Sequence, residues 1–154
     1  MPEILFYHLE RAGLEEVLPG LLERTLERGW RALVCVGSQE RAEHLDSHLW
    51  TFREESFLPH GMEQDPRASQ QPVLLSVEGR NLNGANVVFF ADGAAPEEWS
   101  ATSLGGYDRI VMLFDGRDPA ATEAARSHWK GARATGFDTT YWQQSESGRW
   151  EKKA

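Results

Sequence analysis

The sequence contains one cysteine, Cys35, so no disulfide can form within the chain. It has no apolar run that approaches the roughly 20 residues a transmembrane helix needs. Its first residues, MPEILFYHLE, lack the basic segment and cleavage site of a secretory signal and lead directly into a strand pattern. These absences predict a cytoplasmic protein that does not contact membranes. Cys35 lies inside an apolar run, so we expect a buried, unreactive thiol.

The chain also has too little positive charge for a general nucleic-acid binder. It carries 16 Lys and Arg residues against 24 Asp and Glu residues, a net charge of −8. Domains whose whole surface binds nucleic acid usually have a basic excess, so we exclude that class, though not a local basic patch. Six tryptophans in 154 residues is a high number. Because tryptophan is enriched at protein interfaces, this number favours a binding protein.

The motifs of common enzyme sites are missing. The first strand–helix turn, residues 8–13, has one glycine in place of the three of a dinucleotide site, and no GxxxxGK[ST] loop follows. No GxSxG elbow of a hydrolase is present. Gly37-Ser38 begins the second turn, and we interpret it as a strand end with a helix cap. The alternative is a phosphate cradle in a small nucleotide- or phosphate-binding α/β enzyme.

A metal site is also poorly supported. His44 and His48 are four residues apart and share a helix face, but Leu45 stands where a zinc protease needs its glutamate. A zinc site needs a third protein ligand, and nothing in the sequence places His60 or Asp46 beside the pair. We therefore predict no metal, no cofactor and no catalytic centre.

The apolar pattern alternates between strand and helix along most of the chain. Pro19 interrupts the first helix pattern and predicts a kink or a later helix start. Apolar runs predict strands at residues 3–9, 32–36, 73–77, 86–91, 109–114 and 137–143. Apolar stripes predict helices at residues 14–29, 39–50 and 119–135, with a short helix opening at Pro96 and a long loop over residues 52–71.

This order predicts a single α/β domain over residues 1–143. We expect an open, mostly parallel sheet with helices on both faces, Rossmann-like but without a nucleotide-binding motif. Residues 144–154 are polar and are predicted to be a frayed tail.

The last predicted helix carries a basic stripe. Arg126, Lys130 and Arg133 have spacings of four and three and share one face, with Trp129 expected to stand exposed among them. The opposite face carries mostly small side chains, and His128 on it is predicted to be a packing residue. A basic stripe of about 10 Å beside an aromatic suits an acidic peptide with an apolar end group. A solvated face and single-stranded DNA, with Trp129 stacking on a base, are the alternatives.

Aromatic residues also gather in the stretch LWTFREESFLPHG, residues 49–61. Trp50 and Phe57 fit an anchor patch for a protein partner. Alternatively, both side chains fold back and cap the core beneath a long loop.

Two strings of residues resemble the chi subunit of bacterial DNA polymerase III holoenzyme, a clamp-loader accessory protein. One is Leu49-Trp50 followed by Ser56-Phe57-Leu58-Pro59-His60. The other is the basic helix that runs into Gly136-Phe137. The resemblance extends from the first strand to about Trp142.

The resemblance implies a non-catalytic adaptor. Chi binds the psi subunit of the clamp loader, or an iron–sulfur helicase in its place, and Trp50 and Phe57 match that surface. Chi also binds the acidic C-terminal tail of single-stranded DNA-binding protein, so its contact with nucleic acid is indirect. The positions that match the tail site are Arg126, Trp129, Lys130 and Arg133. Thr122 stands where the family can carry a lysine, and either Arg133 or Arg117 could compensate.

Overall fold

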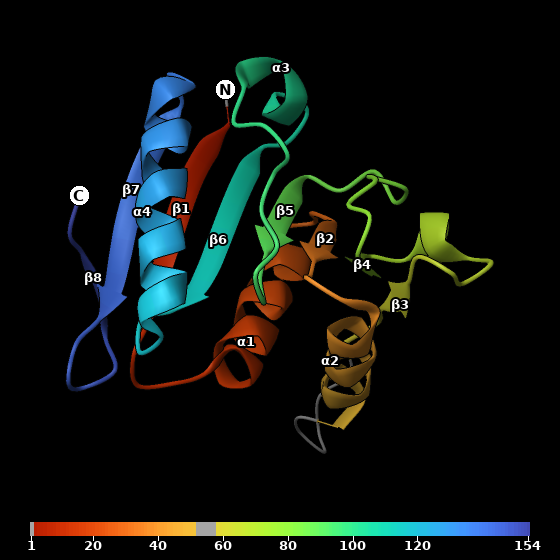
Figure 1. Ribbon diagram of the computed structural model, residues 1–154. Coiled ribbons are helices and arrows are strands. Elements are labelled where there is room, and N and C mark those ends of the chain that lie inside the picture. Colours follow the sequence, from red (N-terminus) through yellow and green to blue (C-terminus); the bar gives the residue numbers. More distant parts are fainter. Residues whose placement is uncertain (1, 52–57) are drawn as a thin grey trace.

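A computed structural model describes residues 2–51 and 58–154 of the chain (Figure 1). Within these residues, eight strands form one sheet in the order β3-β4-β2-β5-β6-β1-β7-β8. Neighbouring strands are parallel, except that β7 and β8 are antiparallel. The predicted open, mostly parallel α/β sheet is therefore confirmed. The strands are β1 Glu3–Leu9, β2 Ala32–Cys35, β3 Gly61–Met62, β4 Val73–Ser76, β5 Val87–Phe90, β6 Arg109–Asp115, β7 Asp138–Gln144 and β8 Trp150–Lys152.

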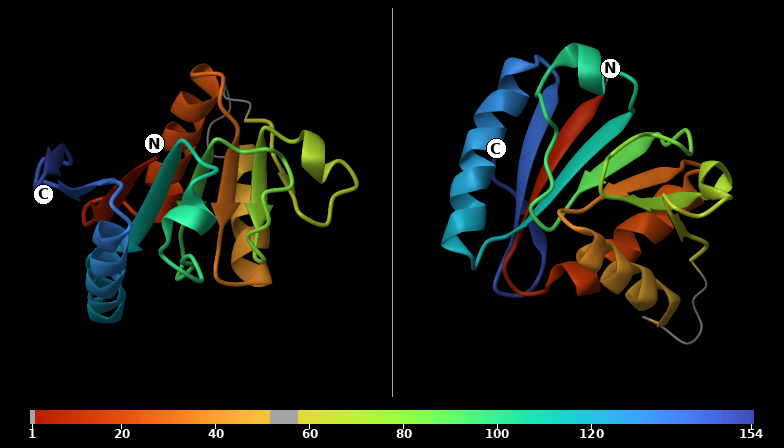
Figure 2. Two further views of the ribbon diagram at one scale, coloured as in Figure 1. Left: turned by 90° about the horizontal axis from the view of Figure 1, so that it is seen from above. Right: turned by 45° about the vertical axis from the view of Figure 1, so that its right-hand side comes forward.

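Helices cover both faces of the sheet, as the alternating pattern predicted. The view from above places α4 and α1 on opposite sides of the strands (Figure 2). Leu18 and Leu22 of α1 and Leu45 of α2 pack into one buried cluster, while Ala125 and Ala132 of α4 pack into the other. The helices are α1 Leu14–Glu27, α2 Gln39–Thr51, α3 Ala101–Leu104 and α4 Pro119–Ala134, with a 3₁₀ turn at Ala68–Gln70.

Strand β1 divides its side chains between the two clusters. Ile4 and Phe6 point to the side of α4 and are fully buried. Tyr7 and Leu9 pack with the cluster on the side of α1. Because side chains alternate along a strand, a strand with helices on both faces becomes a continuous apolar run. That is why the sequence pattern identified β1 so clearly.

Pro19 lies inside α1, which begins at Leu14, so a helix start after the proline is wrong. A proline has no backbone N–H, and here the carbonyl of Glu15, four residues earlier, loses its helical partner. His48 of α2 supplies a replacement, because its Nε2 lies 2.6 Å from that carbonyl oxygen. A carbonyl accepts hydrogen bonds, so the imidazole must donate.

Three other predictions need correction. The predicted helix at Pro96 is wrong: α3 begins later, where Ser100 accepts a hydrogen bond from the Ser103 amide. The predicted 52–71 loop contains β3 and a 3₁₀ turn among its described residues. The polar tail is not frayed, because Trp150–Lys152 forms β8 against β7. The short strands β3 and β8 form by pairing with another strand, whereas a local cap sets the start of α3.

Candidate functional site

Helix α4 has defined ends that fix the position of its basic face. Asp118 caps the first turn, with its carboxylate accepting a hydrogen bond from the Ala120 amide at 3.0 Å. Pro119 occupies the first turn, where its missing N–H costs nothing. Just beyond the helix, Gly136 adopts a positive φ of 84°, which a residue with a side chain resists.

The basic stripe, Arg126, Lys130 and Arg133, lies exposed on the outer side of α4. Ala125 and Ala132 on the inner side are buried against the sheet. Arg126 makes an ion pair with Glu123 at 3.6 Å, but the two side chains are 74% and 77% exposed. Exposed pairs of this kind contribute little, so Arg126 can exchange this partner for another carboxylate.

Trp129 does not stand exposed among these cations, contrary to the prediction. It is half-buried, with its ring centroid 5.4 Å from Phe6 and 5.7 Å from Tyr141, both in edge-to-face geometry. The guanidinium carbon of Arg133 lies 5.6 Å from the Trp129 ring centroid, within range of a cation–π contact. Trp129 is thus part of the core on one side and of the surface on the other.

His128 has the packing role that the sequence predicted. The Trp99 Nε1–H donates a hydrogen bond to His128 Nδ1 at 3.1 Å. Burial lowers the pKa of His128, which favours the neutral imidazole that can accept this bond.

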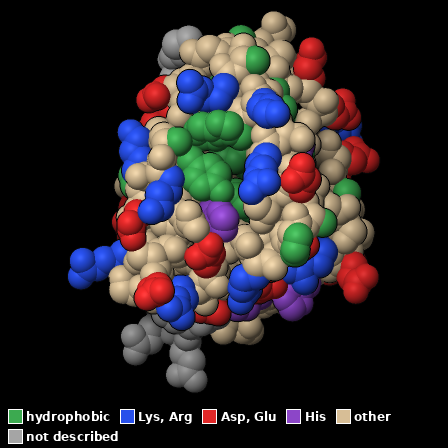
Figure 3. All heavy atoms as spheres, turned by 60° about the vertical axis from the view of Figure 1, so that its left-hand side comes forward, with side chains coloured by type: hydrophobic (Ala, Val, Ile, Leu, Met, Phe, Trp, Pro, Cys, Tyr) green, Lys and Arg blue, Asp and Glu red, His purple; other side chains and the backbone are tan. Residues whose placement is uncertain are grey.

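The side of the molecule formed by α4, β7 and β8 has an apolar hollow bordered by Lys and Arg side chains (Figure 3). The half-buried aromatics of this region include Trp129 and Tyr141. The Tyr141 hydroxyl lies 2.6 Å from His8 Nδ1, which fixes the ring. Sequence reasoning did not identify Tyr141. The signal in the sequence was its position in the strand predicted directly after the last helix. In the structure that strand pairs with β1, below α4.

Trp50 lies at the end of α2 with 48% of its surface exposed. Its ring centroid is 4.1 Å from that of His60, which is buried. His60 is held in place by the Leu58 carbonyl at 2.7 Å and by a carboxylate oxygen of Asp46 at 3.2 Å. The predicted partner residue Phe57 lies outside the described residues. The structure does not bring Trp50 near the basic stripe, since α2 and α4 lie well apart in every view (Figures 1 and 2).

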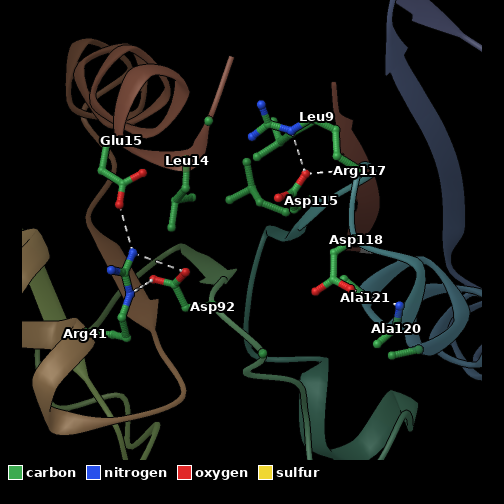
Figure 4. A pocket seen from close by; sticks show the side chains of 14 residues that line it. Leu9, Leu14, Glu15, Arg41, Asp92, Asp115, Arg117, Asp118, Ala120 and Ala121 are labelled. Carbon is green, nitrogen blue, oxygen red and sulfur yellow. Dashed lines mark hydrogen bonds and ion pairs between the residues drawn. The ribbon is translucent and has the colours of Figure 1, made fainter. Parts of the chain in front are cut away.

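A pocket of about 660 Å³ opens at the carboxyl ends of β1, β5 and β6 (Figure 4). This is where open α/β sheets bind their ligands. Arg41 bridges two carboxylates there, at 2.8 Å from Glu15 and 3.0 Å from Asp92. Burial alone would raise the pKa of Glu15, but the hydrogen bond and the charge of Arg41 hold the pKa below its usual value. Arg41 therefore offsets part of the negative charge of these two carboxylates.

The charge of this pocket disfavours nucleotides. Its lining has four carboxylates and two guanidinium groups, a net charge of −2: Glu15, Asp92, Asp115 and Asp118 against Arg41 and Arg117. A phosphate entering the pocket would meet this negative charge.

Gly37-Ser38 has a structural explanation. A Cβ on Gly37 would lie 2.4 Å from the Asp92 carbonyl oxygen, so the close approach of two backbones requires glycine. The Ser38 hydroxyl accepts a hydrogen bond from the Arg41 amide at 3.2 Å and caps α2. Gly37 and Ser38 therefore both have structural roles, and neither requires a bound phosphate.

Nucleotides should therefore leave the thermal stability of the protein unchanged. A ligand at one hundred times its Kd stabilises its protein by about 2.7 kcal/mol, which a melting experiment detects. We expect no shift in Tm with millimolar ATP or ADP in a thermal-shift assay. A reproducible rise in Tm that Ser38→Ala abolishes would contradict this prediction and restore the enzyme hypothesis.

The remaining candidate groups have structural partners. His44 lies 3.3 Å from a Glu15 carboxylate oxygen, and His48 contacts the Glu15 carbonyl. Over the described part of the chain, no group of three His, Cys, Asp or Glu side chains is arranged to hold a metal ion. Cys35 is buried, and burial raises the pKa of its thiol to about 12. The same described residues include no helix long and apolar enough to cross a membrane.

Comparisons with known proteins agree on one family. The family model described as DNA polymerase III chi subunit, HolC, matches residues 1–140. The "DNA polymerase III subunit chi" of Pseudomonas aeruginosa PAO1 is 28% identical over 119 residues, which cover 74% of this chain and 78% of that protein. The "Probable DNA polymerase III subunit chi" of Rickettsia prowazekii is 26% identical over 88 residues, 57% of this chain and 53% of that protein. The match thus spans about half the length of the Rickettsia relative.

Among solved structures, the C-terminal domain of the DEAD-box protein Dbp5 is similar in fold. The TM-score is 0.57 at 14% sequence identity, and the match covers 93% of this chain and 90% of that domain. At this identity the likeness concerns the arrangement of the sheet and helices alone.

Proposed function

This chain belongs to the DNA polymerase III chi subunit family, a family of replication accessory subunits, and on that premise we propose that it is a non-catalytic adaptor. One surface binds the acidic C-terminal tail of single-stranded DNA-binding protein. A second surface binds the psi subunit and so joins the protein to the clamp loader. This role has its place in the cytoplasm, at the replication fork.

The observation that carries the tail assignment is the apolar hollow bordered by cations on an otherwise acidic protein (Figure 3). The tail of single-stranded DNA-binding protein combines carboxylates with a C-terminal phenylalanine, a chemistry that the resemblance to chi supplies. Carboxylates accept charge-assisted hydrogen bonds from Arg126, Lys130 and Arg133. The terminal ring packs against Trp129 in the hollow.

Arg133 is the better candidate to compensate for Thr122 at the position where the family can carry a lysine. The Thr122 hydroxyl donates a hydrogen bond to the Asp118 carbonyl at 3.1 Å and offers no charge to a ligand. Arg117 lines the separate pocket at the carboxyl ends of the strands, where it pairs with Asp115 at 3.1 Å. Arg133 lies over the Trp129 ring, where it can reach a carboxylate beside a bound aromatic.

The psi-binding surface includes Trp50 and Phe57, and an iron–sulfur helicase can use the same surface in place of psi. The half-exposed indole of Trp50, held against His60, supports this part of the proposal. A large aromatic that is fixed in position loses little conformational entropy when a partner covers it.

Lys130→Glu should weaken binding of an acidic tail peptide by about 1–3 kcal/mol, the scale of a hydrogen bond to a charged group. The substitution reverses a charge that faces the peptide carboxylates. Wild-type affinity should also fall with added salt, because salt screens exposed charges. Isothermal titration calorimetry at two salt concentrations measures both effects.

Arg80→Glu is the control for this experiment. It changes the net charge by the same amount on an exposed loop, where Arg80 pairs with Glu78. We expect this variant to bind the peptide as wild type does. Unchanged affinity in Lys130→Glu, or an equal loss in Arg80→Glu, would remove the tail from the proposed site.

Direct binding of single-stranded DNA is the alternative use of the basic stripe. The net charge of −8 and the half-buried position of Trp129 disfavour it, since a base needs an open ring face for stacking. A titration with an oligonucleotide in the same calorimeter distinguishes the two ligands.

A further inference from the structure

The hairpin formed by β7 and β8 extends beyond the part of the chain that the family model matches. That match ends at residue 140, whereas β8 covers Trp150–Lys152. Antiparallel pairing joins Trp142 to Lys152 and Gln144 to Trp150. The Trp150 ring packs edge-to-face on Tyr7, with centroids 4.8 Å apart, on the side of the sheet that α1 covers. This contact holds β8 in place.

The register of the hairpin places the next residue, Lys153, opposite Tyr141. The Lys153 amide donates to the Tyr141 carbonyl at 2.8 Å, one step beyond the pair of Trp142 and Lys152, and the Tyr141 amide donates to the Ala154 carbonyl at 3.2 Å. Directly opposed residues of an antiparallel pair point to the same face. Lys153 therefore shares the face of Tyr141, which packs against Trp129 of α4. Lys152 shares the other face with Trp142.

Tyr141 therefore has Arg126 of α4 on one side and the backbone of Lys153 on the other. Burial raises the pKa of its hydroxyl, and the nearby positive charge of Arg126 on α4 offsets part of this rise. Lys153, the residue after β8, contacts the same tyrosine through its backbone amide. Figure 3 shows Lys and Arg side chains on both borders of the apolar hollow, toward α4 and toward the C-terminal strand.

We infer that β8 forms the second wall of the acidic-peptide site and that Lys153 is a peptide-binding residue. The peptide lies between α4 and β8, with its apolar end on Trp129 and Tyr141 and its carboxylates shared between Lys153 and the basic stripe. This inference rests on the proposed function and names residues outside the family match. The Lys and Arg side chains on both borders attract the carboxylates of an acidic peptide and repel a cationic one (Figure 3).

Lys153 can change partners when a peptide arrives. Its side chain is 49% exposed and lies 3.5 Å from the Glu151 carboxylate. Exposed pairs between near neighbours contribute little to stability, so exchange of Glu151 for a peptide carboxylate costs little. Lys153 directly follows β8, and its amide is bonded to the Tyr141 carbonyl, so its backbone position is set before binding.

The test compares two adjacent lysines that differ in the face on which they lie. Lys153→Glu should weaken an acidic peptide with a C-terminal phenylalanine by roughly tenfold, as expected for loss of a charge-assisted contact. Lys152→Glu makes the same change in charge on the opposite face and should leave the affinity within about twofold at 0.15 M salt, where screening limits longer-range effects. Calorimetry measures both, with Lys130→Glu in parallel and circular dichroism to check folding.

Each outcome has a definite meaning. A selective loss in Lys153→Glu supports the second wall. Equal losses in the two variants indicate a general charge effect and overturn it. If Lys130→Glu weakens the peptide and Lys153→Glu does not, the wall is wrong and the proposed function stands. If wild type itself fails to bind the peptide, both the proposed function and the wall are wrong.

Discussion

Phe6→Ala should lower the free energy of unfolding by about 3–5 kcal/mol, the usual range for removing a buried phenylalanine ring. Phe6 is fully buried in β1, between strands β6 and β7. Its ring lies 6.0 Å from Trp99 and 5.4 Å from Trp129, centroid to centroid. Truncation leaves a cavity beneath both indoles and removes the edge-to-face contact that supports Trp129. Denaturant unfolding followed by circular dichroism measures the change.

Leu82→Ala is the control for the core. Leu82 is an apolar residue of similar size but is 40% exposed. Its truncation should change the free energy of unfolding by about 0.5 kcal/mol or less, as for most surface sites. A loss below 1 kcal/mol in Phe6→Ala would mean that the two indoles fill the cavity or that Phe6 lies outside the core.

Trp50→Ala should weaken binding of the psi subunit by about 2 kcal/mol or more, the effect of truncating a central interface aromatic. Trp50 combines a large exposed area with a fixed ring position against His60. The same substitution should leave the acidic peptide unaffected, because α2 and α4 lie apart and distant sites behave independently (Figure 1). Calorimetry with purified psi and with the peptide measures the two affinities.

Thr51→Ala provides a neighbouring control for this surface. Thr51 is exposed at the end of the same helix, and its hydroxyl donates within the helix to the Ser47 carbonyl. We expect wild-type affinity for psi in this variant. If folded Trp50→Ala binds psi normally, or loses the peptide as well, the assignment of two separate surfaces is wrong.

Sequence reasoning was most successful where burial imposes a repeating pattern. The apolar runs at 3–9, 32–36 and 109–114 predicted strands, and all three lie inside the sheet with neighbours on both sides. Helix α4 was predicted to within one residue at its end, because Asp118, Pro119 and Gly136 mark its limits by local chemistry. Such signals act within a few residues and can be read from the chain alone.

The same local signals missed the elements that depend on distant partners. Strand β8 is short and polar on one side, so its sequence resembles a tail. It forms because Trp150 packs against Tyr7 and because its backbone pairs with β7. No property of residues 145–154 alone reveals either contact, since the conformational entropy cost of a short strand is offset by non-local packing.

The candidate peptide site likewise has one part that local sequence predicts and another that depends on distant contacts. Helical spacing alone determined that Arg126, Lys130 and Arg133 share a face. The tertiary structure decided what lies beside them. Trp129 packs against Phe6 and Tyr141 and does not project into solvent. The pairing of the C-terminal residues with β7 places Lys153 on the other side of the hollow. The spacing of residues along one helix fixes their directions from its axis. The neighbours of that helix depend on how the sheet orders its strands, and this order is set by burial across the whole chain.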